Sequence, residues 1–94
     1  MLKYTRSIQK IILDKLVYPA QARESGFQGT VKLSLHLLNS GRLLGAEIKS
    51  SSGYKVLDDD ALQAAEGVSS YNPFPPSIET EDLWIDIPVA YRLD

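Results

Sequence analysis

Side chains of two kinds alternate along the last segment of the chain, residues 83–93. Leucine, isoleucine, valine and tyrosine occupy its odd positions, and the even positions hold Trp84, Asp86, Pro88, Ala90 and Arg92. Successive side chains of a β-strand point to opposite faces of a sheet, so this period of two predicts a long strand with one buried face. A proline inside a strand is tolerated mainly at an edge, where its missing N–H would have pointed away from the ladder. The last strand is therefore predicted to be an edge strand.

The first part of the chain has the apolar period of an amphipathic helix. Its apolar residues recur at three- and four-residue steps from Tyr4 to Leu16, with polar and charged residues between them. Because the residue before a proline is pushed out of helical geometry, Tyr18 and Pro19 are predicted to end this helix. Pro19 can then open a second, short helical turn that closes at Gly26.

The middle of the chain predicts a β-hairpin followed by a second main helix. Residues 31–37 and 44–48 both alternate, and the turn between them contains Asn39 and Gly41, which tolerate positive φ. Residues 56–68 repeat apolar side chains on one narrow, alanine-rich face, which predicts a helix. The proline-rich stretch that follows fixes φ and removes amide donors, so the helix cannot continue through it.

These elements follow one another in the order α-β-β-α-β. They predict an α+β fold with a three-stranded antiparallel sheet, two main helices packed on one face, and the opposite face partly open. A chain of 94 residues buries one modest core, so one domain is expected over residues 1–94. Within it, residues 1–28 supply the N-terminal helix and the Tyr-Pro segment, and residues 29–94 supply the hairpin, the second helix and the last strand. The exposed edge of such a sheet can receive an added strand.

Composition narrows the class of function. Ten basic and twelve acidic residues give a net charge of -2, which argues against a nucleic-acid partner. The chain has no cysteine, so it forms neither a disulfide framework nor a thiolate metal site. Its apolar runs are too short to span a bilayer, and no signal-peptide pattern opens it. We expect a soluble domain without a cofactor.

Two groups of side chains could suggest chemistry, but each has a simpler interpretation. His36, the only histidine, stands on the polar side of its predicted strand, and no motif supplies the partners of a nucleophile–base pair with Ser34 or of a metal site. The run Asp58, Asp59 and Asp60 lacks the alternating ligands, glycine and terminal glutamate of an EF-hand loop. We interpret it as the negatively charged start of the second helix. No catalytic residue or metal ligand is predicted, and the chain is not expected to be an enzyme.

Short motifs are spread along nearly the whole chain in a fixed order. They are Tyr18-Pro19-Ala20 with Ala22-Arg23, Gly26, Gly29-Thr30-Val31, Ser40-Gly41, Ser51-Ser52-Gly53, Leu57-Asp58 with Ala61-Leu62, Pro73-Phe74-Pro75-Pro76 and Ile87-Pro88-Val89-Ala90-Tyr91-Arg92-Leu93. As a spaced set, they resemble the C-terminal domain of the TonB family of energy transducers. Members of that family sit in the periplasm, anchored by an N-terminal membrane helix and a proline-rich spacer. They pull on outer-membrane transporters with the proton-motive force harvested by an inner-membrane complex.

The resemblance implies a partner and a place to bind it. In the family, a short N-terminal motif of the transporter, the TonB box, pairs as a strand with the last strand of the domain. The resemblance also implies contact with the inner-membrane proton-channel complex through N-terminal regions outside this chain. The implied partner-binding residues are Trp84, Asp86, Ile87, Pro88, Val89, Ala90 and Tyr91. Because Pro88 lacks an amide donor, the half of the strand that receives the peptide stays open.

Alternatives to this interpretation remain. A TolA-like envelope-integrity domain shares the general layout, and a stand-alone adaptor could use the same strand pairing. An exposed edge strand can also pair with its own copy, which would give a homodimer. Well-known TonB members carry a Gln-Pro pair just before the Tyr-Pro motif, whereas this chain has Lys15-Leu16-Val17 there. Trp84 is either an anchor for a partner or a residue covered by neighbouring side chains.

Overall fold

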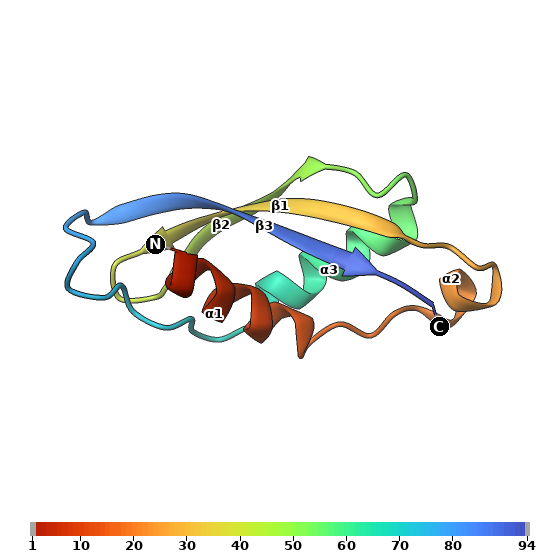
Figure 1. Cartoon of the computed structure of the whole chain (residues 1–94), viewed down its shortest axis with the longest axis horizontal. Coiled ribbons are helices and arrows are strands. Elements are labelled where there is room, and N and C mark those ends of the chain that lie inside the picture. Colours follow the sequence, from red (N-terminus) through yellow and green to blue (C-terminus); the bar gives the residue numbers. More distant parts are fainter. Residues whose placement is uncertain (1, 94) are drawn as a thin grey trace.

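Three antiparallel strands form one sheet in the computed structural model, which describes residues 2–93. The elements are α1 (Leu2–Leu13), α2 (Ala20–Glu24), β1 (Gly29–Leu38), β2 (Leu43–Ser50), α3 (Lys55–Glu66) and β3 (Asp82–Tyr91). The sheet has the order β2-β1-β3, with β1 in the centre. Figure 1 shows α1 and α3 on one side of the sheet, and α2 beyond its end, near the C-terminus. The predicted α+β class, the three strands and the order of the main elements are confirmed.

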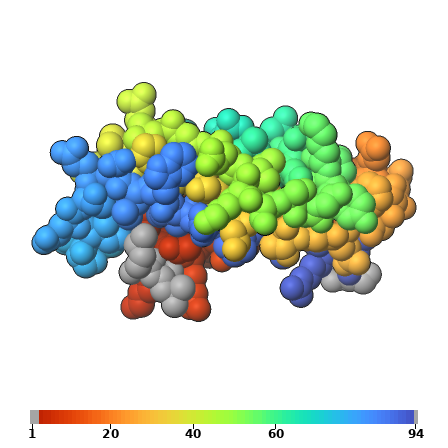
Figure 2. All heavy atoms as spheres, turned by 90° about the horizontal axis from the view of Figure 1, so that it is seen from above, coloured from red at the N-terminus to blue at the C-terminus, as the bar shows by residue number. Residues whose placement is uncertain are grey.

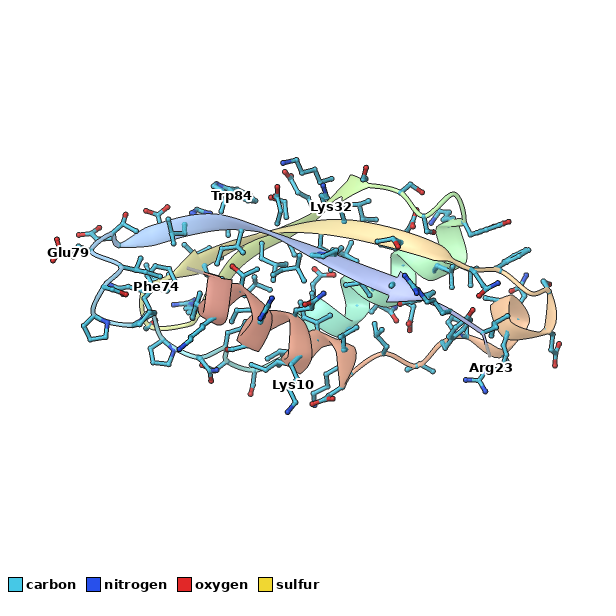
Figure 3. All side chains as sticks on the ribbon, in the orientation of Figure 1. Lys10, Arg23, Lys32, Phe74, Glu79 and Trp84 are labelled. Atoms are coloured by element: carbon cyan, nitrogen blue, oxygen red, sulfur yellow. The ribbon has the colours of Figure 1, made fainter. Side chains whose placement is uncertain are left out.

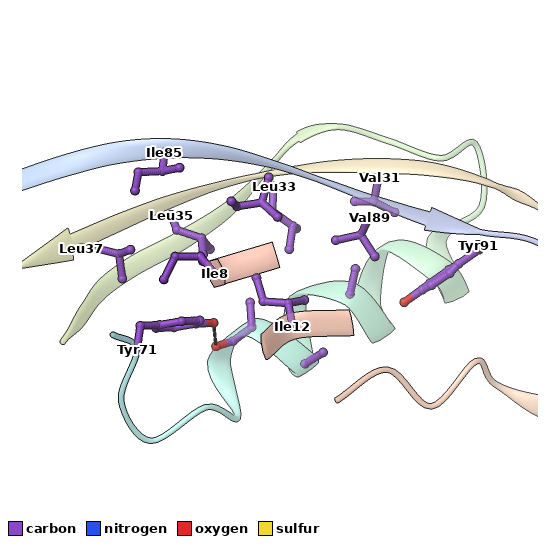
Figure 4. Packing of buried hydrophobic residues seen from close by; sticks show 14 of the residues in the cluster. Ile8, Ile12, Val31, Leu33, Leu35, Leu37, Tyr71, Ile85, Val89 and Tyr91 are labelled. Carbon is purple, nitrogen blue, oxygen red and sulfur yellow. Dashed lines mark hydrogen bonds between the residues drawn. The ribbon is translucent and has the colours of Figure 1, made fainter. Parts of the chain in front are cut away.

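The hydrophobic core lies between the sheet and the two long helices (Figure 4). Along β3 the odd-numbered side chains are buried, Leu83 only partly, and the even-numbered ones are exposed, as their alternation predicts. The other contributors are buried apolar residues of α1, β1 and α3: Tyr4, Ile8, Ile12, Val31, Leu33, Leu35, Leu37, Leu57, Ala61, Ala64 and Ala65. Burying one large aliphatic side chain contributes roughly 1.5–3 kcal/mol, so this face of the sheet is held firmly against the helices. Among residues 2–93, no helix lies over the opposite face (Figure 1).

The first helix ends earlier than the apolar period predicts. Its α-helical part stops at Leu13, and the amides of Lys15 and Leu16 donate to carbonyls only three residues back, at 2.9 and 3.3 Å. Such bonds tighten the last turn and satisfy carbonyls that would otherwise lack partners. Tyr18 then adopts a φ of 55°, in the left-handed region that non-glycine residues seldom occupy. The chain is therefore held in a sharp exit from α1.

Asp60 of α3 holds that exit in place. Its buried Oδ2 accepts hydrogen bonds from the amides of Val17 and Tyr18, both at 3.3 Å, and from the hydroxyl of Tyr91 at 2.6 Å. Burial, and then the hydrogen bond to this carboxylate, raise the pKa of Tyr91, so its hydroxyl remains a donor. One carboxylate thus joins α3 to the segment after α1 and to the end of β3. The interpretation of Asp59 and Asp60 as part of the charged helix start was wrong, because only Asp58 of the three lies in the first turn of α3.

Asp58 does lie in the first turn of α3, and it holds the loop that precedes the helix. Its carboxylate accepts hydrogen bonds from the hydroxyl of Ser51 and from both the amide and the hydroxyl of Ser52, the latter two at 2.9 and 2.7 Å. Burial raises the pKa of Asp58, but these hydrogen bonds outweigh burial and leave the pKa lowered. The connection from β2 to α3 is therefore fixed by an ionised side chain.

The segment between α3 and β3 is attached to the hairpin turn. Gly41 has a φ of 93°, and a Cβ there would lie 2.1 Å from the carbonyl oxygen of Tyr71. The amide of Tyr71 donates to the carbonyl of Gly41 at 2.9 Å, and the amide of Phe74 donates to that of Asn39 at 2.9 Å. The buried hydroxyl of Tyr71 donates to the carbonyl of Ala65, and burial raises its pKa to about 12. These contacts set the position from which β3 begins.

Replacing Tyr91 with phenylalanine tests the junction at Asp60. The variant keeps the buried ring but removes the hydroxyl that donates to the carboxylate, so the free energy of unfolding should fall by about 1–3 kcal/mol in urea denaturation. Tyr54→Phe is the matched control, because the exposed Tyr54 ring stacks on Phe27 and its hydroxyl has no hydrogen-bond partner among residues 2–93. Equal stability of the two variants would contradict a structural role for Asp60.

Asp58 should make stability depend on pH in the acid range. Its folded-state pKa is lowered, so the unfolded chain takes up the proton first as the pH falls. The stabilisation is complete above the unfolded pKa of about 3.9 and is lost as the pH falls through the folded value. Asp58→Asn should therefore be less stable than the wild type at pH 7, by ~1 kcal/mol, with a smaller difference at pH 3. The exposed Asp59→Asn is the control, and a pH-independent difference for Asp58→Asn would refute the role.

Candidate functional site

β3 is an edge strand, as Pro88 predicts. It pairs with β1 over ten consecutive positions, from Gly29 opposite Tyr91 to Leu38 opposite Asp82, and no register shift interrupts the pairing. The strand order places nothing beyond it in the sheet. The outer edge of β3, meaning the side that faces away from β1, is therefore a long edge of a regularly paired strand, with Pro88 as a residue that has no amide hydrogen to donate.

Two hydrogen bonds determine which residues of β3 face outward. The carbonyl of Glu81, just before the strand, accepts from the amide of Asn39 at 2.7 Å, which continues the ladder with β1. The carbonyl of Pro88 instead accepts from the side chain of Gln9 in α1, at 2.8 Å. In an antiparallel pair, both backbone groups of a residue point to the same side, and the side alternates along the strand. The backbone groups of the odd-numbered residues of β3 thus bond to β1. The backbone groups of the even-numbered residues face the outer edge, and we call these residues the outward set.

The predicted binding residues lie together on β3 but are divided between its two faces. Trp84, Asp86, Pro88 and Ala90 are exposed on the open face, and their backbone groups belong to the outward set. The remaining three side chains are buried in the core: Ile87, Val89 and Tyr91. A partner strand along the outer edge would therefore meet side chains only of the first group directly, while the second group holds the strand in place.

Trp84 forms the main exposed apolar surface of this site, with 53% of its surface accessible. Its ring stacks on that of His36 in β1, with ring centres 4.6 Å apart and planes 11° from parallel. His36 Nε2 also lies 2.5 Å from Asp82 Oδ2, a contact that helps to hold the imidazole in place. Figure 3 shows Trp84 above the sheet, on the face away from the helices. Trp84 is thus an exposed and positioned aromatic ring.

His36 and Asp82 were not among the predicted site residues. The alternation placed His36 on the polar side of β1, but the stacking depends on which residue of β3 lies opposite it. The register pairs His36 with Trp84 on one side and with Gly45 on the other. A Cβ added to Gly45 would have no atom within 4 Å, so the ring pair borders open space on the β2 side. The contact between His36 and Trp84 could not be predicted from either segment alone, because it depends on the register between β1 and β3.

Asp86 carries a charge that is neutralised within the open face. Lys49 Nζ lies 2.6 Å from Asp86 Oδ2, and this hydrogen bond lowers the pKa of Asp86, with a further contribution from Lys32. Both partners are partly exposed, so the pair contributes only about 0–1 kcal/mol to stability. Figure 2 looks onto this face, where side chains of β2 and β3 lie uncovered and α1 shows only at the margin beside β3. The carboxylate of Asp86 is therefore paired with a lysine from β2 on the open face.

The other edge of the sheet, formed by β2, is less regular. Register shifts interrupt its pairing with β1 between Lys32 and Leu33 and again between His36 and Leu37. Such irregularities twist a strand and disturb the row of donors and acceptors that an added strand needs. Of the two edges, the outer edge of β3 is the better template for strand addition.

The part of the chain that the structure covers offers little for other kinds of chemistry. Two shallow hollows occur in it, one against α3 and one between Asn39 and the segment 74–81, and neither is lined by histidine, serine or cysteine. Among residues 2–93, no three acidic, histidine or cysteine side chains are grouped so as to hold a metal ion. None of the helices described is long and apolar enough for a membrane crossing. The outer edge of β3 is the candidate site that the strand pairing itself provides.

Amide hydrogen exchange tests the assignment of the outer edge. Along β3 the odd-numbered amides should exchange slowly, because they bond to β1, whereas the amides of Trp84, Asp86 and Ala90 should exchange quickly. The internal control is β1, whose central residues 33–36 pair on both sides and should be protected at odd and even positions alike. Uniform protection along β3 would show that its outer edge is covered.

Comparisons with known proteins identify the family and the fold. The family described as Gram-negative bacterial TonB protein C-terminal matches residues 14–93. Protein tonB2 of Pseudomonas aeruginosa is 35% identical over 77 residues, and protein TonB of Pasteurella multocida is 32% identical over 90 residues. These alignments cover 82% and 96% of this chain, but only 28% and 34% of the relatives. The chain thus spans about a third of the length of these curated relatives.

Two solved structures share the architecture. The solution structure of the Helicobacter pylori TonB C-terminal domain, residues 179–285, matches with a TM-score of 0.83 and 26% identity, covering all of this chain and 84% of that one. TolAIII bound to a peptide derived from the N-terminus of TolB matches with a TM-score of 0.67 and 20% identity, covering 93% and 73% of the two chains. The second likeness shows a shared fold. The family match and the two relatives show that this chain belongs to the TonB C-terminal domain family.

Proposed function

We propose that this domain couples energy from the inner membrane to outer-membrane transport by binding the TonB box of a transporter as an added β-strand. It acts without catalysis. The observation that carries this proposal is β3 itself, which pairs regularly with β1 over ten residues and forms an edge of the sheet in a domain of the TonB family. Pairing with that edge would extend the sheet by one strand.

The geometry of the edge supports a weak and reversible contact. Each new ladder hydrogen bond contributes about 0.5–1.5 kcal/mol net, because both strands give up hydrogen bonds to water. The ladder to β1 already holds the backbone of β3 extended, so little additional order is required of the domain. A handful of such bonds suits a partner that must be engaged and released repeatedly.

The remaining parts of the proposed role belong to the longer protein. The curated relatives are about three times the length that aligns with this chain. We infer a periplasmic location, with an inner-membrane anchor and the contact with the proton-channel complex in regions outside these 94 residues. In this arrangement, the domain is the part of the longer protein that binds the transporter.

A TolA-like role in envelope integrity is the second candidate. The solved TolAIII structure, which shares this fold, contains a peptide derived from the N-terminus of TolB. The match of the TonB family to residues 14–93 favours a TonB-box partner over a TolB-like one. Pairing between two copies of β3, which would give a homodimer, is a competing use of the same edge.

An NMR titration of the isotope-labelled domain with synthetic TonB-box peptides tests the proposal. Amide signals of β3, residues 82–91, should shift progressively and saturably, since the new hydrogen bonds form there. A peptide from the N-terminus of TolB serves as the comparison and should bind more weakly. Shifts confined to α1 and α3, or none at all, would refute strand addition at β3. Stronger binding of the TolB peptide would instead support the TolA-like role.

A further inference from the structure

The outer edge of β3 is divided into two unequal parts at Pro88. This residue belongs to the outward set, but it has no amide hydrogen to donate, and its carbonyl already accepts from Gln9 at 2.8 Å. A partner strand would find neither a donor nor a free acceptor there without displacing the side chain of Gln9. A continuous ladder with a partner strand can therefore form before Pro88 or after it, but not across it.

The part before Pro88 offers most of the outward groups. Trp84 and Asp86 each present an amide and a carbonyl on this side. Asp82 adds its amide, while its carbonyl accepts from the hydroxyl of Thr80 at 3.2 Å. That local bond also shows that the carbonyl of Asp82 points away from β1, as the alternation along β3 predicts for an even-numbered residue. Residues 82–86 thus supply five outward groups in an uninterrupted stretch of strand.

The part after Pro88 offers much less. Ala90 is the one outward residue left before β3 ends at Tyr91. The Tyr91 side chain is buried against Tyr18, with ring centres 5.2 Å apart. Only the two backbone groups of Ala90 within β3 remain for a partner in this part.

The first part also carries the side chain best suited to anchor a partner. Residues directly opposite each other in neighbouring antiparallel strands place their side chains on the same face, about 4.5–5.5 Å apart. A partner residue opposite Trp84 would therefore lie on the open face beside the indole ring. The stack on His36 already fixes that ring, so little side-chain entropy is lost on binding. The carboxylate of Asp86, two residues along the same face, is paired with Lys49 at 2.6 Å.

We propose that the partner strand pairs with residues 82–86 and packs an apolar side chain against Trp84, and that Pro88 and Gln9 end the ladder. This inference rests on the proposed strand pairing at β3 and specifies it further. The ligand is an extended peptide with an apolar residue on the side that faces the open surface of the sheet. Ala90 and the end of β3 take no part in the contact.

Proline substitutions separate the two parts of the edge. Asp86→Pro removes an outward donor in the first part, and Asp86→Ala is its matched control, since it loses the carboxylate but keeps the amide. Ala90→Pro removes the outward donor of the second part. No hydrogen bond to β1 is lost in either proline variant, because both residues belong to the outward set. Peptide affinities are measured by NMR titration with the same TonB-box peptides, and folding is checked from the amide spectrum.

Asp86→Pro should bind about three- to tenfold more weakly than Asp86→Ala, which corresponds to the loss of one net hydrogen bond. Ala90→Pro should bind as the wild type does. Equal affinities for the two Asp86 variants, together with weakened binding by Ala90→Pro, would overturn the inference and leave strand pairing at β3 standing. A wild-type domain that binds no TonB-box peptide would refute the proposed function, and this inference with it.

Trp84→Ala provides a second test that does not depend on tolerance of a new proline. Truncation of an aromatic anchor commonly weakens binding about tenfold or more, so a loss of this size is expected. The control is Leu44→Ala, which removes another exposed apolar side chain, on β2. Equal effects of the two substitutions would overturn the assignment of Trp84 as the anchor.

Discussion

The hydrogen-bonded ladder between β1 and β3 is the interaction on which the fold and the site both depend. It runs over ten positions without a shift, and its alternation assigns every residue of β3 to one of two tasks. Odd-numbered residues bond to β1 and bury their side chains in the core. Even-numbered residues turn their backbone groups outward and their side chains to the open face. The same pairing that completes the core therefore creates the surface that a partner strand can use.

Contacts at both ends keep this strand in register. At its beginning, the amide of Asn39 reaches the carbonyl of Glu81, and the segment between α3 and β3 is attached to the hairpin turn. At its end, the hydroxyl of Tyr91 bonds to the buried carboxylate of Asp60, which also holds the exit from α1. A one-residue slip would exchange the buried and exposed faces, so these anchors preserve the outward set. Because β3 is already ordered, pairing with a partner strand would cost little conformational entropy in this strand.

Much of the fold could be predicted from the sequence, because periods of two and of three to four residues report directly which side chains are buried. The edge position of β3 was predicted from Pro88, because a proline inside a strand is tolerated mainly at an edge. Contacts between distant segments could not be predicted, because no local pattern encodes them. The carboxylate of Asp60 was interpreted as part of the charged start of the second helix, but it joins three segments. The stack of His36 on Trp84 depends on register, and the capping of Pro88 by Gln9 depends on how α1 packs.

The central claim is that a partner strand adds to the outer edge of β3, beside Trp84. Intermolecular nuclear Overhauser effects between the labelled domain and an unlabelled TonB-box peptide test it most directly. Strand addition predicts contacts from the peptide backbone to the amide and α protons of Trp84 and Asp86, and from a peptide side chain to the indole ring. Contacts from the peptide to β2, or to the helices without any to β3, would contradict it.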